Sequence, residues 1–385
     1  MEFRFPDVEA ASVAAVASNL ARGTVIDVPS NPTVLPSQLC LKLACLPGQD
    51  QTPDWRFATG FDAENLERVI IDALPHMHPA RRDVHPNNDC VFLALAFLRS
   101  GLPIFRLSRP LSMRPQTLES FILRGLRGLS SSFATSNPEY GSPSLDELLD
   151  AEQKAAIPAA ALGTRFIVDG KHIACSRVGD ASTRQAFCSH KLRTAALGFQ
   201  AVVTNFGECV HVAAGARAAE HDIAVWGRHR NMVLARLRTL ISGDPLILAD
   251  LGYRSATYPE IITNNEPNPT LNSRRLVVEN FFGRMVQVFA SSRYRFRLGL
   301  EHFDTFIRAL CHATNRTIAA SPLRNDDFLH YRANISAWHA REDAHRISHR
   351  VAVTKSRRRN SQNDDSAIDE INVDCVELPA KRQIT

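Results

Sequence analysis

The sequence predicts an α/β fold in which a mixed sheet is flanked by helices and preceded by a small all-α, helix-turn-helix-like region. Two observations predict it. Between residues 144 and 325, short β-type runs alternate with helical segments, which is the order of elements that builds a sheet covered by helices. Between residues 61 and 130, only helical patterns occur. With 385 residues, 44% of them hydrophobic and 22% charged, the chain is long enough to bury a core under such a sheet.

The two ends of the chain lack these patterns. Residues 1–60 are rich in Ala, Pro and small polar residues, so we expect an irregular N-terminal region, to which no role is assigned. Residues 350–385 lack aromatic residues, which favours a disordered tail. The tail contains a basic cluster of Lys355 and residues 357–359, interpreted either as a nuclear-import or phosphate-binding cluster or as a solvated charge patch.

Composition argues against several classes of protein. The net charge of +5 permits an anionic partner without requiring one. The eight cysteines are scattered and include no C-x-x-C pair, which indicates neither a zinc ribbon nor a disulfide framework. His76, His78 and His85 lack a convincing fourth ligand for zinc. No signal-peptide pattern opens the sequence, and the longest apolar run, residues 91–98, is too short for a bilayer. We therefore expect a soluble intracellular protein with no membrane partner.

The helical region is expected to contain three helices, over residues 65–74, 87–101 and 112–128. The third has an apolar stripe at helical spacing and Pro115 where a first-turn proline is tolerated. Its arginines fall mostly elsewhere, which is typical of a helix-turn-helix that contacts DNA. The alternative is a helical subdomain whose arginines are merely solvated. The candidate nucleic-acid-binding residues here are Arg114, Gln116, Arg124 and Arg127.

A turn-rich stretch, residues 130–143, predicts a linker to the next domain. Ser144 and Glu147 then have capping-box spacing and open a short helix.

The predicted α/β domain, residues 144–325, begins with a strand from Arg165 that enters a turn at Asp169-Gly170. The elements expected after it are a hairpin over 197–216, a helix over 221–241, a strand over 246–249, a loop over 259–273, and helices over 274–292 and 303–318.

Three acidic residues stand where a site would form. Asp169 and Asp250 each follow an apolar run, and strand ends are where open α/β sheets place their sites. Glu279 lies at the margin of the apolar arc of its helix, beside the core yet within reach of the rim. Carboxylates brought this close repel each other, and divalent cations make such a cluster tolerable. Oxygen ligands select Mg²⁺ or Mn²⁺, and two such ions suit phosphodiester hydrolysis.

Three blocks in this order, IVDGKHIA, ADLGY and VVENFFGRM, resemble the signature blocks of the PIF/Harbinger-type DDE transposases and their domesticated nuclear relatives. The resemblance implies an RNase H-like fold over the predicted α/β domain. It also implies that Asp169, Asp250 and Glu279 are the catalytic and metal-binding residues. A His-Asp pair usually opens the intervening helix in that family, and His221-Asp222 matches it.

The function implied is metal-dependent endonuclease or transposase-like hydrolysis or strand transfer of DNA phosphodiester bonds with two Mg²⁺ or Mn²⁺ ions. Double-stranded DNA is the expected partner, the nucleus is the expected location, and the need for a separate DNA-binding partner protein is left open. Lys171, Lys191 and Arg193 are candidates for phosphate contact or are solvated strand-edge residues. His221 and Asp222 are candidates for an extra metal or substrate contact.

Other interpretations stay open at this point. Asp169 alone is equally well a turn former, and Asp222 a helix N-terminal acid favoured by the dipole. His172 and His190 are expected to be packing or hydrogen-bonding residues. For the whole chain, the first alternative is a catalytically inactive domesticated transposase that acts as a nuclear DNA-binding or partner-recruiting protein. A hydrolase of another phosphoester is the second.

Overall fold

The computed structural model of the chain describes residues 43–44, 54–77, 87–139, 141–176, 187–189, 191–263, 268–321 and 323. The chain forms two compact units, Met1–Leu323 and Arg324–Thr385, and all described residues belong to the first. The expected disordered tail at 350–385 and its basic cluster lie outside the described residues, as do most of residues 1–60 and His78, His85 and His190.

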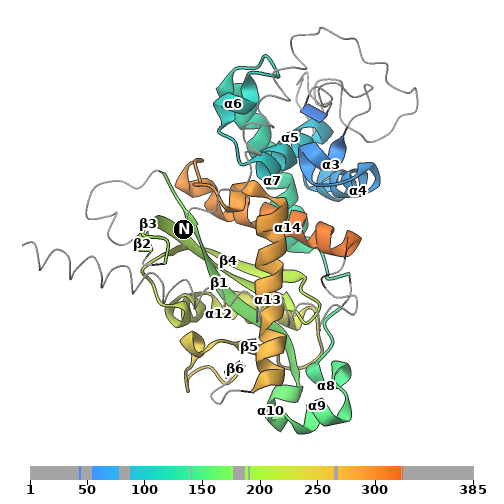
Figure 1. Cartoon of the computed structure of the whole chain (residues 1–385), viewed down its shortest axis with the longest axis vertical. Helices are drawn as coiled ribbons and strands as arrows, with labels where there is room; N and C mark the ends of the chain where they lie inside the picture. Colours follow the sequence, from blue (N-terminus) through green and yellow to red (C-terminus); the bar gives the residue numbers. More distant parts are fainter. Residues whose placement is uncertain are drawn as a thin grey trace, which may run out of the picture. The chain divides into compact units, whose positions relative to one another are not determined.

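The first part of the unit is a bundle of helices (Figure 1). Its elements are α3 (Trp55–Thr59), α4 (Ala63–Ala73), η1 (Leu74–His76), α5 (Asn87–Ser100), α6 (Ile104–Ser108) and α7 (Pro115–Thr135). Every residue of α5 from Asp89 to Leu98 is buried, which is typical of a helix enclosed on all sides. This helix packs against α3, α4 and α7 and forms the centre of the bundle.

Helix α7 is longer than the sequence predicts. Residues 130–135, expected to begin a linker, continue the helix to Thr135. Leu129 and Phe133 extend its buried stripe, and buried Ser132 Oγ lies 3.4 Å from Nε2 of His312 on α14. Burial against α14 therefore outweighs the weak helix propensity of the serines. The helical region and the sheet share one compact unit, while the predicted boundary between two domains stays a prediction.

Gly125 on α7 allows the close crossing of α5 and α7. A Cβ added there would lie 2.0 Å from the Cys90 carbonyl oxygen, so Gly125→Ala must push two helix backbones apart. We expect it to lower the free energy of unfolding by at least about 2 kcal/mol in a denaturant titration. Gly283 on α13 is the matched control, because a Cβ added there meets nothing within 4 Å. Gly283→Ala should be neutral or stabilise by up to about 1 kcal/mol, and an equal loss in both variants would contradict the packing described.

Three short helices lead into the sheet: α8 (Leu145–Leu148), α9 (Ala151–Ala155) and α10 (Ala159–Leu162). The predicted cap of α8 is present, since the Glu147 backbone N–H donates to Ser144 Oγ at 3.3 Å and the Glu147 side chain accepts from the Ser144 backbone.

The sheet is mixed and its central strand is β1 (Thr164–Ala174). On one side, β1 pairs antiparallel with β3 (Thr194–Thr204), which pairs antiparallel with β4 (Cys209–Arg217) and with the short β2 (Cys188–Ser189). On the other side, β1 pairs in parallel with β5 (Leu246–Ala249), which pairs in parallel with β6 (Ile261–Thr263). The β3–β4 hairpin and the β5 strand agree with the prediction.

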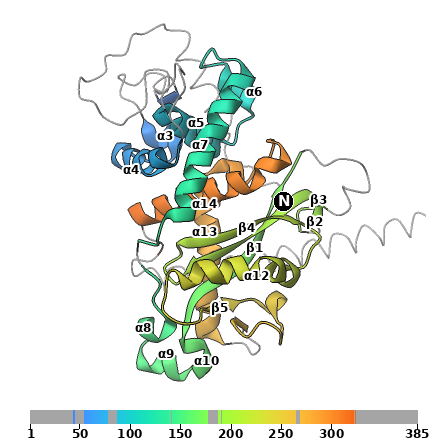
Figure 2. The ribbon, with the colours of Figure 1, turned by 180° about the vertical axis from the view of Figure 1, so that it is seen from behind.

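Helices cover both faces of the sheet. These are α12 (Asp222–Arg238), α13 (Pro269–Val288) and α14 (Phe303–Ala320), with the short η2 (Leu251–Tyr253), η3 (Ala290–Ser292) and η4 (Leu300–His302). Alternate residues of β1 face opposite layers. Phe166 and Val168 join the core under α12, and Ile167 joins the core under α13 and α14. Helix α13 crosses in front of the sheet in Figure 1, and α12 in the reverse view of Figure 2.

The segment predicted as a loop over 259–273 is more ordered than expected. It contributes strand β6, and α13 begins at Pro269 inside it. The Asn268 side chain accepts from the Leu271 backbone N–H at 3.1 Å, so the Asn-Pro pair acts as a helix start and not as a turn. Among the described residues, no helix has the length and apolar character needed to cross a membrane.

Candidate active site at the end of the central strands

Asp169 lies inside a strand, not at its exit as the sequence predicts. Strand β1 continues to Ala174 because β3 pairs with it along this whole length, with Asp169 opposite Ala201. The partner on the other side, β5, is short and ends at Ala249. Asp169 therefore stands where β1 runs past the end of β5. Asp169 is therefore beside the end of β5, although its own strand continues past it.

Asp250 is the first residue after β5. The parallel register pairs Ile167 with Leu248, and continuing it by two residues brings Asp169 next to Asp250. Asp250 also caps η2, since its Oδ1 accepts from the Gly252 backbone N–H at 2.9 Å. The two acids from distant parts of the sequence are thus neighbours across two parallel strands.

Glu279 reaches the same neighbourhood from α13, which packs on the face of the sheet to which Asp169 belongs by strand alternation. Its side chain is 44% exposed and forms an ion pair with Arg275, one turn earlier, at 2.6 Å. Both residues act on Asp169: Arg275 lowers its pKa and Glu279 raises it. Arg275 is therefore the resident cation of this acidic group, a role the sequence reasoning missed although its spacing to Glu279 is a recognisable helix pair.

Burial is the main electrostatic feature of Asp169. The pKa of its carboxyl is raised to about 6, mainly because burial removes it from water. A hydrogen bond from the Gly170 backbone N–H at 2.8 Å and the charge of Arg275 oppose this rise, and the negative charges of Asp250 and Glu279 contribute to it. The carboxyl therefore resists ionisation, as expected for an acid held among other acids without enough positive charge nearby.

Asp222 is a fourth member of the group. It opens α12 on the other face of the sheet, and its Oδ1 would lie 2.7 Å from a Cβ added to Gly170. Burial and then the charge of Asp250 raise the pKa of the Asp222 carboxyl. Asp250 thus interacts with Asp169 on one side and with Asp222 on the other. His221, which precedes Asp222, is exposed and makes no side-chain cap for the helix.

Tyr253 closes the inner side of this acidic group. Burial and the charges of Asp222, Asp169 and Asp250 raise the pKa of its phenol well above the usual value. Its buried hydroxyl finds no hydrogen-bond partner among the described residues. Tyr253 is the last residue of the ADLGY block, and that pattern does not indicate that the phenol is buried beside the acids.

The donor set suits a hard divalent cation, because it consists of carboxylate oxygens and because positive charge would relieve the repulsion acting on Asp169 and Asp222. In the part of the chain that the structure describes, no three His, Cys, Asp or Glu side chains are gathered closely enough to hold a metal ion. The Arg275 ion pair gives a reason, since it engages the Glu279 carboxylate. A cation that binds Glu279 would therefore compete with Arg275 for this carboxylate.

The predicted phosphate-contact residues divide into two groups. Lys171 is on β1, two residues beyond Asp169, with its Nζ 5.4 Å from the centre of the Phe282 ring; burial and then Lys191 lower its pKa. Lys191 and Arg193 are exposed between β2 and β3. The second group belongs to α7 in the helical bundle: Arg114, Gln116 and Arg127 are exposed, and Arg124 is half-buried. Nδ1 of His172 lies 3.0 Å from Ser189 Oγ, a hydrogen-bonding distance that agrees with the packing or hydrogen-bonding role expected for this residue.

A mixed sheet flanked by helices, with acids gathered at the end of its central strands, is consistent with a DDE nuclease. Residues 168–315 match the family model described as DDE superfamily endonuclease. The match begins one residue before Asp169 and ends within α14, so it includes all the acids described above. It supports the DDE superfamily for this part of the chain. No curated protein and no solved structure matches the chain.

Proposed function

We propose that this protein is a metal-dependent, DDE-type endonuclease or transposase-like enzyme of the PIF/Harbinger subtype with an RNase H-like core. The observation that carries the proposal is that three acids from separate elements of the matched region meet: Asp250 follows β5 beside Asp169 of β1, and the charges of Asp250 and Glu279 both act on Asp169. The matched superfamily supports nuclease activity and a DNA substrate.

Each acidic residue has a distinct task in this proposal. Asp169 and Asp250 would hold divalent cations, and Glu279 would complete the ligand set in competition with Arg275. When bound there, Mg²⁺ or Mn²⁺ lowers the pKa of the attacking water or 3′-hydroxyl and stabilises the departing oxyanion. Asp222, with His221 beside it, is an extra contact to metal or substrate. Arg275 neutralises the acidic group until a cation replaces it.

Basic residues around the acids would hold the DNA. Lys171, Lys191 and Arg193 contact phosphates near the site of cleavage, and the exposed face of α7 contacts the duplex as the third helix of a helix-turn-helix-like region. The α7 residues proposed for this contact are Arg114, Gln116, Arg124 and Arg127. The proposal includes a nuclear location and leaves room for a separate DNA-binding partner protein.

A non-enzymatic DNA-binding or partner-recruiting role is the second candidate, and one observation favours it. Arg275 already supplies positive charge to Glu279 and Asp169, so the group is partly neutralised without metal.

Incubation of duplex DNA with the purified protein in Mg²⁺ or Mn²⁺ separates the two functions. We expect cleavage by the wild-type chain and none by the Asp169→Asn/Asp250→Asn double variant. Equal cutting by both proteins would reject the assigned site. DNA binding without cleavage by either protein would favour the second candidate.

A further inference from the structure

The segment after α13 has an alternating pattern of arginine and aromatic residues that the proposed chemistry does not use. Arg293, Arg295 and Arg297 are exposed, whereas Phe296 between the last two is buried. The Phe296 ring lies 5.2 Å from that of Phe303 and 5.1 Å from that of Phe306, centre to centre. The aromatic cluster therefore anchors the segment and leaves the arginines on its surface.

The backbone of this segment is fixed to the central strand. The Phe296 N–H donates to the Ala174 carbonyl at 2.7 Å, and the Ser176 N–H donates to the Phe296 carbonyl at 3.1 Å. These bonds hold Arg295 and Arg297, one residue to each side, in defined positions. Pre-organised arginines lose less conformational entropy on binding a ligand than mobile ones.

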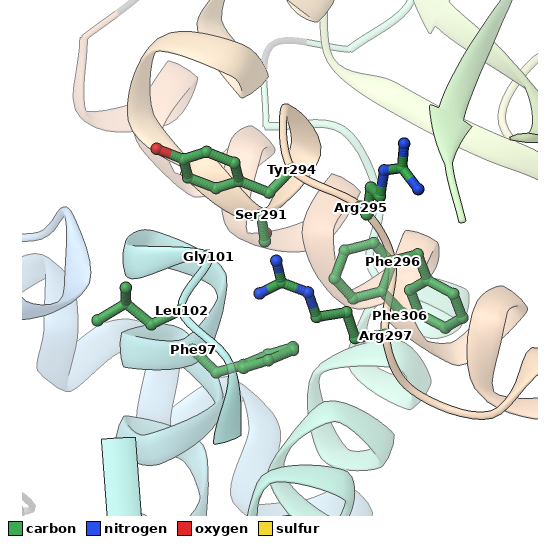
Figure 3. Close-up of a pocket in the computed structure, with 9 residues that line it drawn as sticks. All are labelled: Phe97, Gly101, Leu102, Ser291, Tyr294, Arg295, Phe296, Arg297 and Phe306. Carbon is green, nitrogen blue, oxygen red and sulfur yellow. The ribbon is translucent and has the colours of Figure 1, made fainter. Parts of the chain in front are cut away.

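A pocket opens between this segment and the end of α5 (Figure 3). Gly101 makes the close approach feasible: it has φ +63°, and a Cβ added there would lie 2.9 Å from the backbone of both Ala290 and Ser291. Figure 3 shows the Arg297 guanidinium in the pocket, with Phe97 from α5 on one side and Phe306 from α14 on the other.

The polar groups of the pocket favour an anion. Ser291 lines it and is 6% exposed, and its Oγ is buried without a hydrogen-bond partner among the described residues. A buried hydroxyl left unpaired costs free energy, so a ligand oxygen there would satisfy it. Arg297 forms no ion pair or hydrogen bond with any described residue.

The pocket also has a defined relation to the acidic group. Phe296, which lines the pocket, is bonded through its backbone to Ala174 of β1, and Ala174 follows Asp169 by five residues (174 − 169 = 5) on that strand. Five residues span about 17 Å along an extended strand, which equals about five base-pair rises of duplex DNA. A duplex cut at the acidic group can therefore place a flanking phosphate at this pocket.

We propose that Arg297 and Ser291 form a phosphate-binding pocket that holds one backbone phosphate of DNA flanking the candidate active site. The inference rests on the proposed function for its choice of ligand. Arg297 supplies the charge and several N–H donors, and the Ser291 hydroxyl donates from the buried wall. The site adds a fixed contact point outside the acidic group and α7.

The test measures DNA affinity and inorganic phosphate binding in a metal-free buffer, so that cleavage plays no part. Fluorescence anisotropy of a labelled duplex, repeated over a series of salt concentrations, is compared for wild type, Arg297→Ala and Ser291→Ala. Arg238→Ala is the matched control, because it removes one arginine at the C-terminal end of α12 that forms an ion pair with the exposed Asp244. Ser291→Ala removes an unpartnered hydroxyl and should leave the fold intact.

We expect Arg297→Ala to weaken DNA binding several-fold and to reduce the slope of log Kd against log salt by about 0.9, the loss of one phosphate contact. Ser291→Ala should weaken binding less, and Arg238→Ala should leave both quantities near wild type. Inorganic phosphate should raise the melting temperature of wild type but not of Arg297→Ala.

Two outcomes would overturn the proposal, and a third would separate it from the proposed enzymatic function. Phosphate binding that depends on Arg297, with an unchanged DNA affinity and salt slope, would make the pocket a site for free phosphate and overturn the DNA assignment. Equal effects of Arg297→Ala and Arg238→Ala would indicate general charge attraction and overturn the pocket. Arg297-dependent DNA binding in a protein that never cleaves DNA would leave this inference standing while the proposed enzymatic function fails.

Discussion

Asp250→Asn is expected to lower the rate of metal-dependent DNA cleavage by about 10³-fold or more. The charge of Asp250 raises the pKa of both Asp169 on β1 and Asp222 on α12, so Asp250 is the acid that interacts with both of the others. The substitution keeps the shape and the cap of η2 while removing the negative charge. Loss of a metal ligand removes several kcal/mol of transition-state stabilisation, and about 4 kcal/mol corresponds to 10³-fold in rate.

Asp244→Asn provides the matched control for that experiment. Asp244 lies just before the start of β5, whereas Asp250 lies just after its end. The Asp244 side chain is 86% exposed. We expect this variant to cleave DNA at the wild-type rate. A similar loss in both variants, or near-wild-type cleavage by Asp250→Asn, would remove Asp250 from the site.

Asp169→Asn is expected to stabilise the metal-free protein at neutral pH. The folded pKa of Asp169 is about 6 against an ordinary value of 3.8. As pH rises from 3.8 to 6, the unfolded chain releases this proton while the folded chain keeps it, so the free energy of unfolding falls. The difference between the two pKa values amounts to roughly 1–3 kcal/mol at pH 7, after allowance for partial solvent screening. The asparagine side chain does not ionise, so it adds no such pH dependence to the free energy of unfolding. The variant should therefore be more stable than wild type at pH 7 by this difference.

Denaturant titrations of both proteins at pH 4 and pH 7, in the presence of a chelator, test this expectation. The stability advantage of Asp169→Asn should appear at pH 7 and shrink at pH 4. Added Mg²⁺ or Mn²⁺ should then raise the stability of wild type but not that of the variant, because bound cation stabilises the folded state only where its ligands are intact. An identical pH dependence in the two proteins would show that the Asp169 carboxyl ionises as it does in the unfolded chain.

Periodicity and turn chemistry were sufficient to predict much of the fold. The β3–β4 hairpin, the β5 strand ending before Asp250, and α14 all follow the predicted pattern. Each of these elements has a local sequence signal, such as an apolar run bounded by turn residues.

Other features depend on pairing partners that are far away in the sequence. The Asp169-Gly170 step is a turn signal locally, yet β3 pairs across it and keeps β1 extended. Residues 130–135 are rich in serine, yet packing against α14 keeps them helical. Strand β6 is too short to stand out from its loop, and it forms because β5 offers a free parallel edge.

The candidate acids could be selected from the sequence, but their arrangement could not, and their role as one site stays a prediction. The motif blocks select Asp169, Asp250 and Glu279 as residue types at suitable spacing. The helical spacing of Arg275 and Glu279 permits their ion pair, but it does not indicate that the pair lies beside Asp169. The burial of the Tyr253 hydroxyl beside the acids depends on how η2 packs and follows from no local pattern.

Calorimetric titration of Mn²⁺ into wild type and into Asp250→Asn is the most direct test of the idea that these acids share divalent cations. We predict saturable binding to the wild-type protein and a large loss of affinity in the variant, with both proteins equally folded. Identical binding curves, or no binding to the wild-type protein, would contradict a shared cation site at the end of β1 and β5.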